Sequence, residues 1–261
     1  MYRITQSIVQ SKKINMTVLI VGASGATGSQ LVEQLLIQKH KVKVIVRSPQ
    51  KLPASWKTND NLQIITASLL DFSDTEMSEI VRDCNAVASC LGHNLTWKGV
   101  YGQPRKLVTD ATRRLCNAIK FNSLQRSTKF VLMNTTGNRN HDVYEPISFA
   151  QKFVIALLRL LLPPHVDNEK AADYLRIQIG QNNSFIEWVA VRPDGLIDEE
   201  EVSDYEIHPS PTRSAIFNAG KVSRINVGHF MASLITDNDL WTKWKGQMPV
   251  IYSESSSTLL K

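Results

Sequence analysis

TVLIVGASGATG, residues 17–28, is the stretch that decides the fold of this chain. Its first five residues are apolar or β-branched, a composition typical of a strand that is buried on both faces. Three glycines follow at equal spacing, Gly22, Gly25 and Gly28, and apolar residues then recur at helical intervals as far as Leu36. The stretch therefore predicts a strand, a glycine turn and a helix.

A glycine turn in this context is suited to a ligand that carries phosphate. Gly22 lets the backbone turn sharply, Gly25 lets it approach a pyrophosphate, and Gly28 lets the helix pack against the strand. The amides at the start of the helix then bind the anion. We therefore predict a dinucleotide site, with an ordinary ligand-free turn as the alternative. The predicted contacts come from Gly22, Ser24, Gly25, Ala26, Thr27 and Gly28.

Strand and helix patterns continue to alternate after this unit. Further strands are expected at 41–46, 62–66, 86–90, 129–133 and 185–191, and helices at 73–82, 105–121 and 168–180. Six strands separated by helices indicate an α/β fold, a Rossmann-type doubly wound parallel sheet with helices on both faces. Residues 198–211 lack this regularity and are expected to form a loop or a small irregular C-terminal substrate lobe. A helix at 227–235 and a strand at 249–252 follow.

The expected organisation is a single NAD(P)-binding domain over residues 16–261, with substrate-lobe insertions around 137–165 and 196–220. Residues 1–15 contain no continuous hydrophobic segment and are expected to be a loose N-terminal extension. The apolar run 153–162 is shorter than the roughly 20 residues that cross a bilayer. It predicts a helix packed inside the protein, with a homodimer face or a pocket cover as the alternatives.

Composition excludes several classes of protein. The 261 residues are 43% hydrophobic and 21% charged, which argues against a disordered or fibrous chain. The net charge of +6 is spread along the chain, so a small anionic ligand is expected and nucleic acid is not. Three cysteines share no metal-ligand spacing with the six histidines, so neither a metal site nor a disulfide framework is expected. The expected setting is reducing and cytoplasmic, with no membrane partner.

The end of the second strand bears on the choice of cofactor. In NAD-binding units an acid about 20 residues beyond the glycines binds the ribose 2′-hydroxyl. Here Arg47 stands at the end of the corresponding strand. A guanidinium can pair with a 2′-phosphate, and Ser48 is a second donor. The sequence therefore predicts NADP(H) in preference to NAD(H), with a solvated arginine at a strand end as the alternative.

These residues resemble the short-chain dehydrogenase/reductase superfamily, specifically its atypical NAD(P)H-binding members related to nitrogen-metabolite-regulator-like proteins and flavin/biliverdin reductases. The resemblance covers residues 16–236 and is most specific in the glycine motif. It implies that the ends of the third and fourth strands also contact the cofactor. Ser68 stands where the family commonly has an acid. The implied contacts are Ser68, Leu69, Cys90, Leu91 and Gly92.

The resemblance also implies an active-site lysine on the helix that follows residue 168, and Lys170 matches it. In catalytically typical members a Tyr four residues earlier donates the proton. Val166 occupies that position here, and its side chain cannot transfer a proton. Lys170 is still expected to bind the nicotinamide ribose, with an exposed helix lysine as the alternative.

Other groups are candidates for the missing chemistry. Thr135 and Thr136 follow the fifth strand, where the family usually has a Ser, and a Thr hydroxyl has the same hydrogen-bonding capacity. His165 adjoins the position of the missing Tyr, and His93 and Tyr144 lie beyond two strand ends. Each is a candidate proton donor and, in the alternative, a surface or packing residue.

Two functions are therefore open. The first is an NADPH-dependent oxidoreductase that transfers hydride to a small acceptor, such as a quinone, a flavin or an activated carbonyl. The second is a non-catalytic NADP(H)-responsive regulatory or binding protein, which the missing Tyr favours. In both cases the expected partner is a small molecule.

Overall fold

The computed structural model describes residues 2–4, 15–93, 96, 101–122 and 126–254. The strands are β1 (Tyr2–Ile4), β2 (Thr17–Val21), β3 (Lys41–Val46), β4 (Leu62–Thr66), β5 (Ala86–Ser89), β6 (Thr128–Met133), β7 (Ile186–Pro193), β8 (Gly195–Ile197), β9 (Tyr205–His208), β10 (Lys221–Ser223) and β11 (Val250–Ser253). The helices are α1 (Ala26–Ile37), α2 (Asp74–Val81), α4 (Leu107–Asn122), α5 (Phe149–Leu161), α6 (Pro163–Asp173), α7 (Arg224–Thr236) and α8 (Asn238–Trp244). Four shorter helical segments are η1 (Pro49–Lys51), η2 (Ala54–Thr58), η3 (Leu69–Asp71) and the π-helix η4 (Tyr174–Ile179).

Nine strands form the main sheet, in the order β1-β9-β11-β7-β6-β5-β2-β3-β4. The seven strands from β11 to β4 are parallel to one another. At the edge of the sheet, β9 pairs antiparallel with β11, and β1 pairs antiparallel with β9. The direction of winding reverses between β2 and β5, so the carboxyl ends of these strands form the crevice in which open α/β sheets bind ligands. The predicted doubly wound parallel sheet is confirmed.

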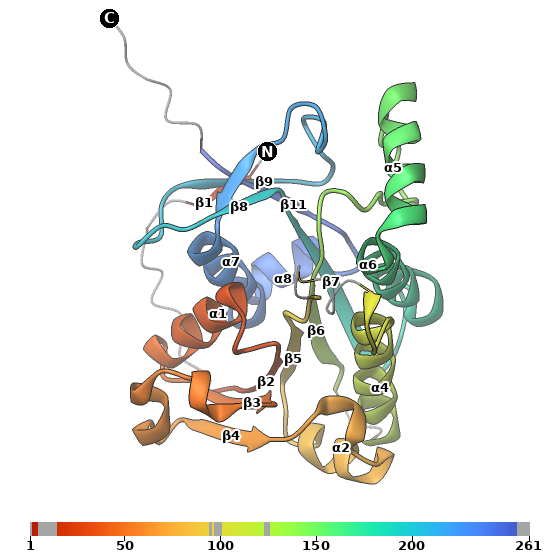
Figure 1. The fold of residues 1–261 in the computed structure, drawn as a ribbon. Coiled ribbons are helices and arrows are strands. Elements are labelled where there is room, and N and C mark those ends of the chain that lie inside the picture. Colours follow the sequence, from red (N-terminus) through yellow and green to blue (C-terminus); the bar gives the residue numbers. More distant parts are fainter. Residues whose placement is uncertain (1, 5–14, 94–95, 97–100, 123–125, 255–261) are drawn as a thin grey trace, which may run out of the picture.

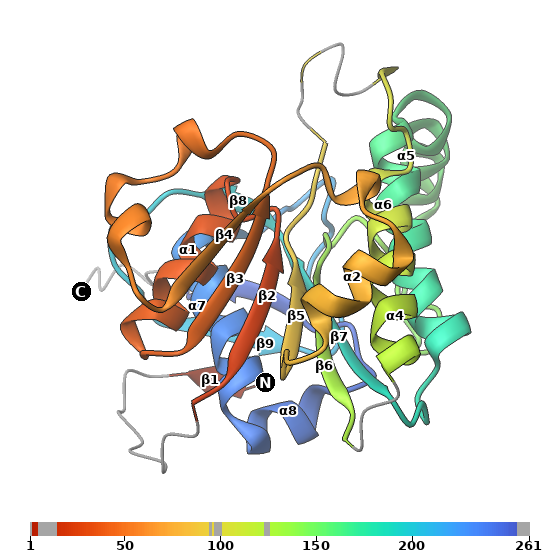
Figure 2. The ribbon, with the colours of Figure 1, turned by 90° about the horizontal axis from the view of Figure 1, so that it is seen from below.

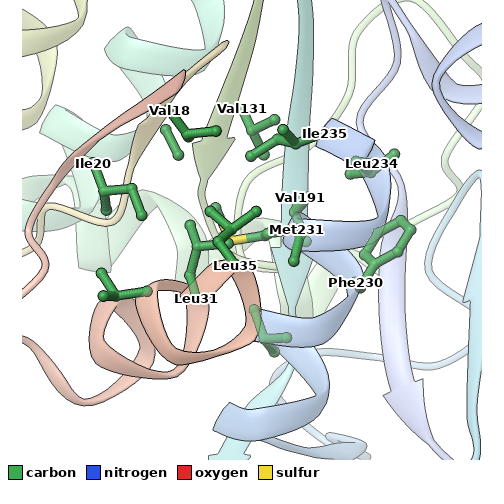
Figure 3. Packing of buried hydrophobic residues seen from close by; sticks show 14 of the residues in the cluster. Val18, Ile20, Leu31, Leu35, Val131, Val191, Phe230, Met231, Leu234 and Ile235 are labelled. Atoms are coloured by element: carbon green, nitrogen blue, oxygen red, sulfur yellow. The ribbon is translucent and has the colours of Figure 1, made fainter. Parts of the chain in front are cut away.

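The alternation of side chains along β2 explains the two helical layers. Val18 and Ile20 pack into the cluster that includes α1, α7 and α8, whereas Leu19 and Val21 pack into the cluster that includes α2, α4 and η4. Figures 1 and 2 show one layer on each side of the sheet. In Figure 3, Leu31 of α1 lies in the first cluster. Burial of each such side chain stabilises the fold by about 1.5–3 kcal/mol.

The prediction of a loop or irregular lobe over 198–211 is wrong in part. β9 lies within that stretch and joins the main sheet beside β11. Tyr205 and Ile207 are fully buried while their neighbours are half-exposed, which is the two-residue period of a strand. Four residues flanked by acids and prolines are too few for that period to stand out in the sequence.

Two further boundaries differ from those predicted. Residues 2–4, expected in a loose extension, form β1 and pair with β9, while residues 5–14 lie outside the described residues. The helix expected at 168–180 begins earlier, at Pro163, and becomes the π-helix η4 at Tyr174. Pro is favourable in the first turn of a helix because the amide that it lacks has no partner there.

The prediction of an internal helix at 153–162 is also wrong. α5 covers these residues, but Ile155 is its single buried side chain. Figures 1 and 2 show α5 beside α6, at the edge of the molecule. Within the described part of the chain, no single helix is long and apolar enough to cross a membrane; α5 and residues 163–179 pass that test only as a pair bent by 104°.

Candidate functional site

The glycine turn after β2 is tightly constrained by backbone. Gly22 has a φ of +80°, and a Cβ on it would lie 2.5 Å from the carbonyl carbon of Cys90. A Cβ on Gly28 would lie 2.2 Å from the carbonyl oxygen of Gly22. Both positions therefore require glycine, as the motif predicts. Gly25 differs, because its φ of −81° is open to any L-residue and a Cβ on it would lie 3.2 Å from the carbonyl oxygen of Gly22, which is tight but does not exclude a side chain.

The start of α1 presents backbone donors at this turn. The first helical hydrogen bond runs from the amide of Ser29 to the carbonyl of Gly25 at 2.9 Å. The amides of residues 26–28 precede that bond and have no partner within the helix. Gly25 offers no capping side chain, and the first turn contains no acid. The positive end of the helix dipole thus lies open to an anion, and the pyrophosphate of a dinucleotide fits it.

Arg47 and Ser48 lie beside the turn. Val21 of β2 is paired with Ile45 of β3. Arg47 stands two residues beyond that pair, so it lies at the carboxyl ends of the strands, where the glycines also lie. Both residues are exposed. The predicted contact of Arg47 with a 2′-phosphate is compatible with this placement.

The loop after β4 is held by a residue that the sequence analysis missed. Arg114 of α4 donates to the carbonyl oxygens of Leu70, at 2.5 Å, and of Phe72. Ser68 is half-buried and Leu69 is buried, at the carboxyl end of the strand. Arg114 therefore positions the segment expected to contact the adenine end of the cofactor. An arginine on a helical pattern carries no sequence signal for that role.

The end of β5 forms the opposite wall of the turn. The amide of Cys90 donates to the carbonyl of Val21 at 2.9 Å, and Gly92 is exposed two residues further on. Burial raises the pKa of the Cys90 thiol to about 12, so this sulfur is not a nucleophile near neutral pH. All three cysteines of the chain are free.

Asp167 is a second residue that the sequence analysis missed. Its carboxylate, 2% exposed, accepts the amides of Val108 and Thr109 at the start of α4, at 2.8 and 3.0 Å. It also contacts Nε2 of His93 at 2.8 Å. Burial by itself raises the pKa of Asp167, but the hydrogen bonds from His93, Thr109 and Val108 outweigh it and lower the pKa. The ionised carboxylate thus ties the β5 loop to α4 and α6, and His93 is its buried partner.

The two candidate threonines after β6 have different surroundings. Thr136 is buried and donates its hydroxyl to Asp194 at 3.1 Å. Thr135 is half-buried and accepts the amide of Gly137 at 3.3 Å, which leaves its hydroxyl proton for another acceptor. A Cβ placed on Gly137 would lie 3.5 Å from Cε1 of His165 and 3.7 Å from Oγ1 of Thr135. Thr135 and His165 therefore both lie next to Gly137.

An ion pair between Arg159 and Glu169 lies beside His165. The carboxylate of Glu169 lies 3.3 Å from Nε2 of His165, which is long for a hydrogen bond. The same carboxylate accepts two shorter hydrogen bonds from Arg159, one from Nε and one from Nη2. Burial raises the pKa of Glu169, but the contacts with His165 and Arg159 outweigh it, so the pKa is lowered and the carboxylate is ionised. Val166 is half-buried and Lys170 is exposed on the same helix, so the ribose contact of Lys170 stays a prediction.

A cavity of about 270 Å³ lies between α5, α6 and the loop after β6. It adjoins the pair of Thr135 and His165, because it shares Gly137 and Glu169 with their surroundings. Its wall contains more basic groups than acids, together with two isoleucines, so it favours a small, partly apolar ligand with negative charge. The lining residues are Gly137, Arg139, His141, Ile147, Lys152, Ile155, Arg159 and Glu169.

Known proteins resemble this chain in sequence or in fold. An uncharacterized chloroplast protein of Arabidopsis thaliana is 27% identical over 207 residues, which cover 79% of this chain and 67% of that protein. A short-chain dehydrogenase/reductase from Veillonella parvula, solved in complex with NADP, superposes with a TM-score of 0.67 at 15% identity, covering 93% of this chain and 96% of that one. The oxidoreductase ylbE from Lactococcus lactis superposes with a TM-score of 0.64 at 15% identity, covering 91% of each chain.

A family model described as NAD(P)H-binding matches residues 22–238. The match begins at the first glycine of the turn and ends beyond α7, so it includes the crevice and the cavity described above. It extends over much more than half of the 261 residues. The chain therefore belongs to the NAD(P)H-binding family.

Proposed function

We propose that this protein is an NADPH-dependent oxidoreductase that reduces a small acceptor held in the cavity beside Thr135 and His165. The observation that carries the proposal is the turn at Gly22 and Gly28, where side chains are excluded and the amides of residues 26–28 are open to a pyrophosphate. When bound there, NADPH supplies the hydride. An acceptor such as a quinone, a flavin or an activated carbonyl requires little more from the protein than binding and a proton.

The residues of the chain divide this work. Arg139, beside His141 in the wall of the cavity, attracts an acceptor with negative charge. Thr135 donates a hydrogen bond to an acceptor oxygen, and His165, which lies beside Glu169, supplies the proton that Val166 cannot. Thr136 keeps the strand end in place through Asp194, so it does not take part directly.

A second function is favoured by one observation, the absence of a proton donor at Val166. In that case NADP(H) binding changes the protein's surface and no turnover occurs. The two proposals share the cofactor site and differ in the role of the cavity. For either function we propose a reducing, cytoplasmic setting, which the three free cysteines support.

Turnover is tested by NADPH oxidation with a panel of quinones, flavins and aldehydes. We expect His165→Ala to lower kcat by roughly 10²-fold, the usual contribution of a general acid, with the Kd for NADPH unchanged. Val166→Ala, a neighbouring change without a titratable group, is the matched control and should retain activity. Tight NADPH binding by the wild type without oxidation of any acceptor would instead establish the binding protein.

Cofactor preference is tested at Arg47. Arg47→Glu should raise the Kd for NADPH by at least ~10-fold, because a carboxylate repels the 2′-phosphate and favours the 2′-hydroxyl of NADH. Lys51, on η1, is also basic and exposed, and Lys51→Glu makes an equal change of charge there. This control should leave the preference for NADPH over NADH unaltered. Fluorescence titration with both cofactors provides the Kd values. The preference for NADP(H) is refuted if the wild type binds NADH as tightly as NADPH.

A further inference from the structure

α5 exposes five large apolar side chains. They lie three or four residues from one another along the helix and so share one face of it. Their exposed fractions run from 44% for Leu157 to 87% for Phe149. We call this face the α5 patch, and its members are Phe149, Phe153, Leu157, Leu160 and Leu161.

α5 therefore carries apolar side chains on two faces. A surface helix usually buries its apolar face and exposes its polar one. In α5, Ile155 is buried and Val154 and Leu158 are half-buried, and yet the α5 patch is exposed as well. Two further exposed aromatics, Tyr144 and Phe217, lie in flanking loops, and Ser214 in the second loop donates to Gln151 at 3.1 Å. Exposed apolar surface of this extent marks a docking site.

The charged side chains of α5 itself are positive. α5 contains Lys152 and Arg159 and no acid. Glu169 already neutralises Arg159, but Lys152 is exposed, and the protein as a whole has a net charge of +6. The partner that fits therefore has an apolar interior, which the α5 patch can enter, and an anionic surface, which Lys152 can contact.

The charge of α5 argues against a second copy of the chain as the occupant. A symmetric pair would place two Lys152 side chains, and no acid of α5, at the same contact.

We propose that α5 docks on the surface of a lipid bilayer that contains anionic lipid, with the α5 patch inserted among the acyl chains and Lys152 at the level of the headgroups. An amphipathic helix with aromatic and leucine side chains on one face and cations beside them lies in this way in the interface. The sequence analysis expects no membrane partner because no segment is long enough to span one. Docking in the interface requires no span. The proposal does not depend on NADPH binding.

Vesicle sedimentation tests this proposal with the full chain. The protein should sediment with mixed phosphatidylcholine–phosphatidylglycerol vesicles and stay in solution with pure phosphatidylcholine or at high salt. The double variant Phe153→Glu/Leu160→Glu should lower the partition coefficient by at least ~10-fold, because it places two charges in the inserted face. Phe121→Glu, the same change at an exposed Phe on α4, is the matched control and should bind as the wild type does.

Circular dichroism and the thermal midpoint show that both variants are folded, which is expected because the replaced side chains are exposed. Equal sedimentation of the double variant and the wild type would overturn the proposal, since general positive charge would then explain binding. A wild-type dimer that the double variant dissociates, without any sedimentation on vesicles, would also overturn it and identify a second copy as the occupant. Failure of the wild type to bind anionic vesicles overturns it directly.

Discussion

Gly25→Asp is expected to raise the Kd for NADPH by at least ~100-fold with only a small change in the thermal midpoint of unfolding, because the gain from helix capping opposes a tight contact of the new Cβ with the carbonyl oxygen of Gly22. Gly25 is the N-cap of α1 with a φ of −81° and a ψ of 158°, a conformation that Asp adopts readily. An Asp side chain at an N-cap binds the free amides of the first turn and stabilises the helix. The introduced carboxylate therefore occupies the place of the pyrophosphate and repels it.

Gly25→Asn is the matched control, because it has the same shape and capping ability without the charge. It should weaken NADPH binding less than Gly25→Asp, and the difference between the two variants isolates electrostatic repulsion at the amides of residues 26–28. Isothermal titration provides both Kd values. An affinity of Gly25→Asp within a few-fold of the wild type would show that the phosphates bind elsewhere.

Arg192→Met is expected to lower the free energy of unfolding by about 3–5 kcal/mol. Arg192, at the end of β7, is fully buried and pairs with both carboxylate oxygens of Glu145, at 2.6 and 3.1 Å. Methionine fills much of the volume but leaves that carboxylate buried and unpaired, and an uncompensated buried charge is strongly destabilising. The guanidinium also donates to the carbonyl oxygens of Asn138, Pro209 and Met248.

Urea unfolding followed by tryptophan fluorescence measures this effect, and a second variant separates its causes. Arg192→Met/Glu145→Leu should recover part of the lost stability, because removing both charges relieves the desolvated carboxylate. Recovery stays incomplete, since Glu145 also accepts the amide of Asn140 at 2.9 Å and the three carbonyls lose their donor. A loss below ~1 kcal/mol in Arg192→Met would show that water or rearrangement compensates for the missing arginine.

The parallel part of the fold could be predicted because its signals are local and strong. A buried parallel strand such as β2 reads as a continuous apolar run, and the requirement for glycine at Gly22 and Gly28 follows from backbone geometry alone. β9 and β1 could not be predicted, since short edge strands depend on partners that are distant in the sequence. The apolar composition of α5 indicated a helix correctly, but composition does not determine whether an apolar face packs in the core or is exposed on the surface.

The candidate site divides in the same way. The cofactor contacts predicted at the ends of β2, β3, β4 and β5 were placed by the order of the strands, and the residues named there do lie at the carboxyl ends of neighbouring strands. The sequence analysis did not single out Asp167 or Arg114, because each stabilises a loop through contacts separated by more than 40 residues in the sequence. The separate environments of Thr135 and Thr136 were equally hidden, since adjacent identical residues differ only in what surrounds them.

The most direct test of the account is a crystal structure of the protein in complex with NADPH. We predict that pyrophosphate oxygens lie within hydrogen-bonding distance of the amides of residues 26–28, with the nicotinamide toward Thr135 and His165. A pyrophosphate bound away from α1, or crystals that bind no NADPH at millimolar concentration, would contradict it.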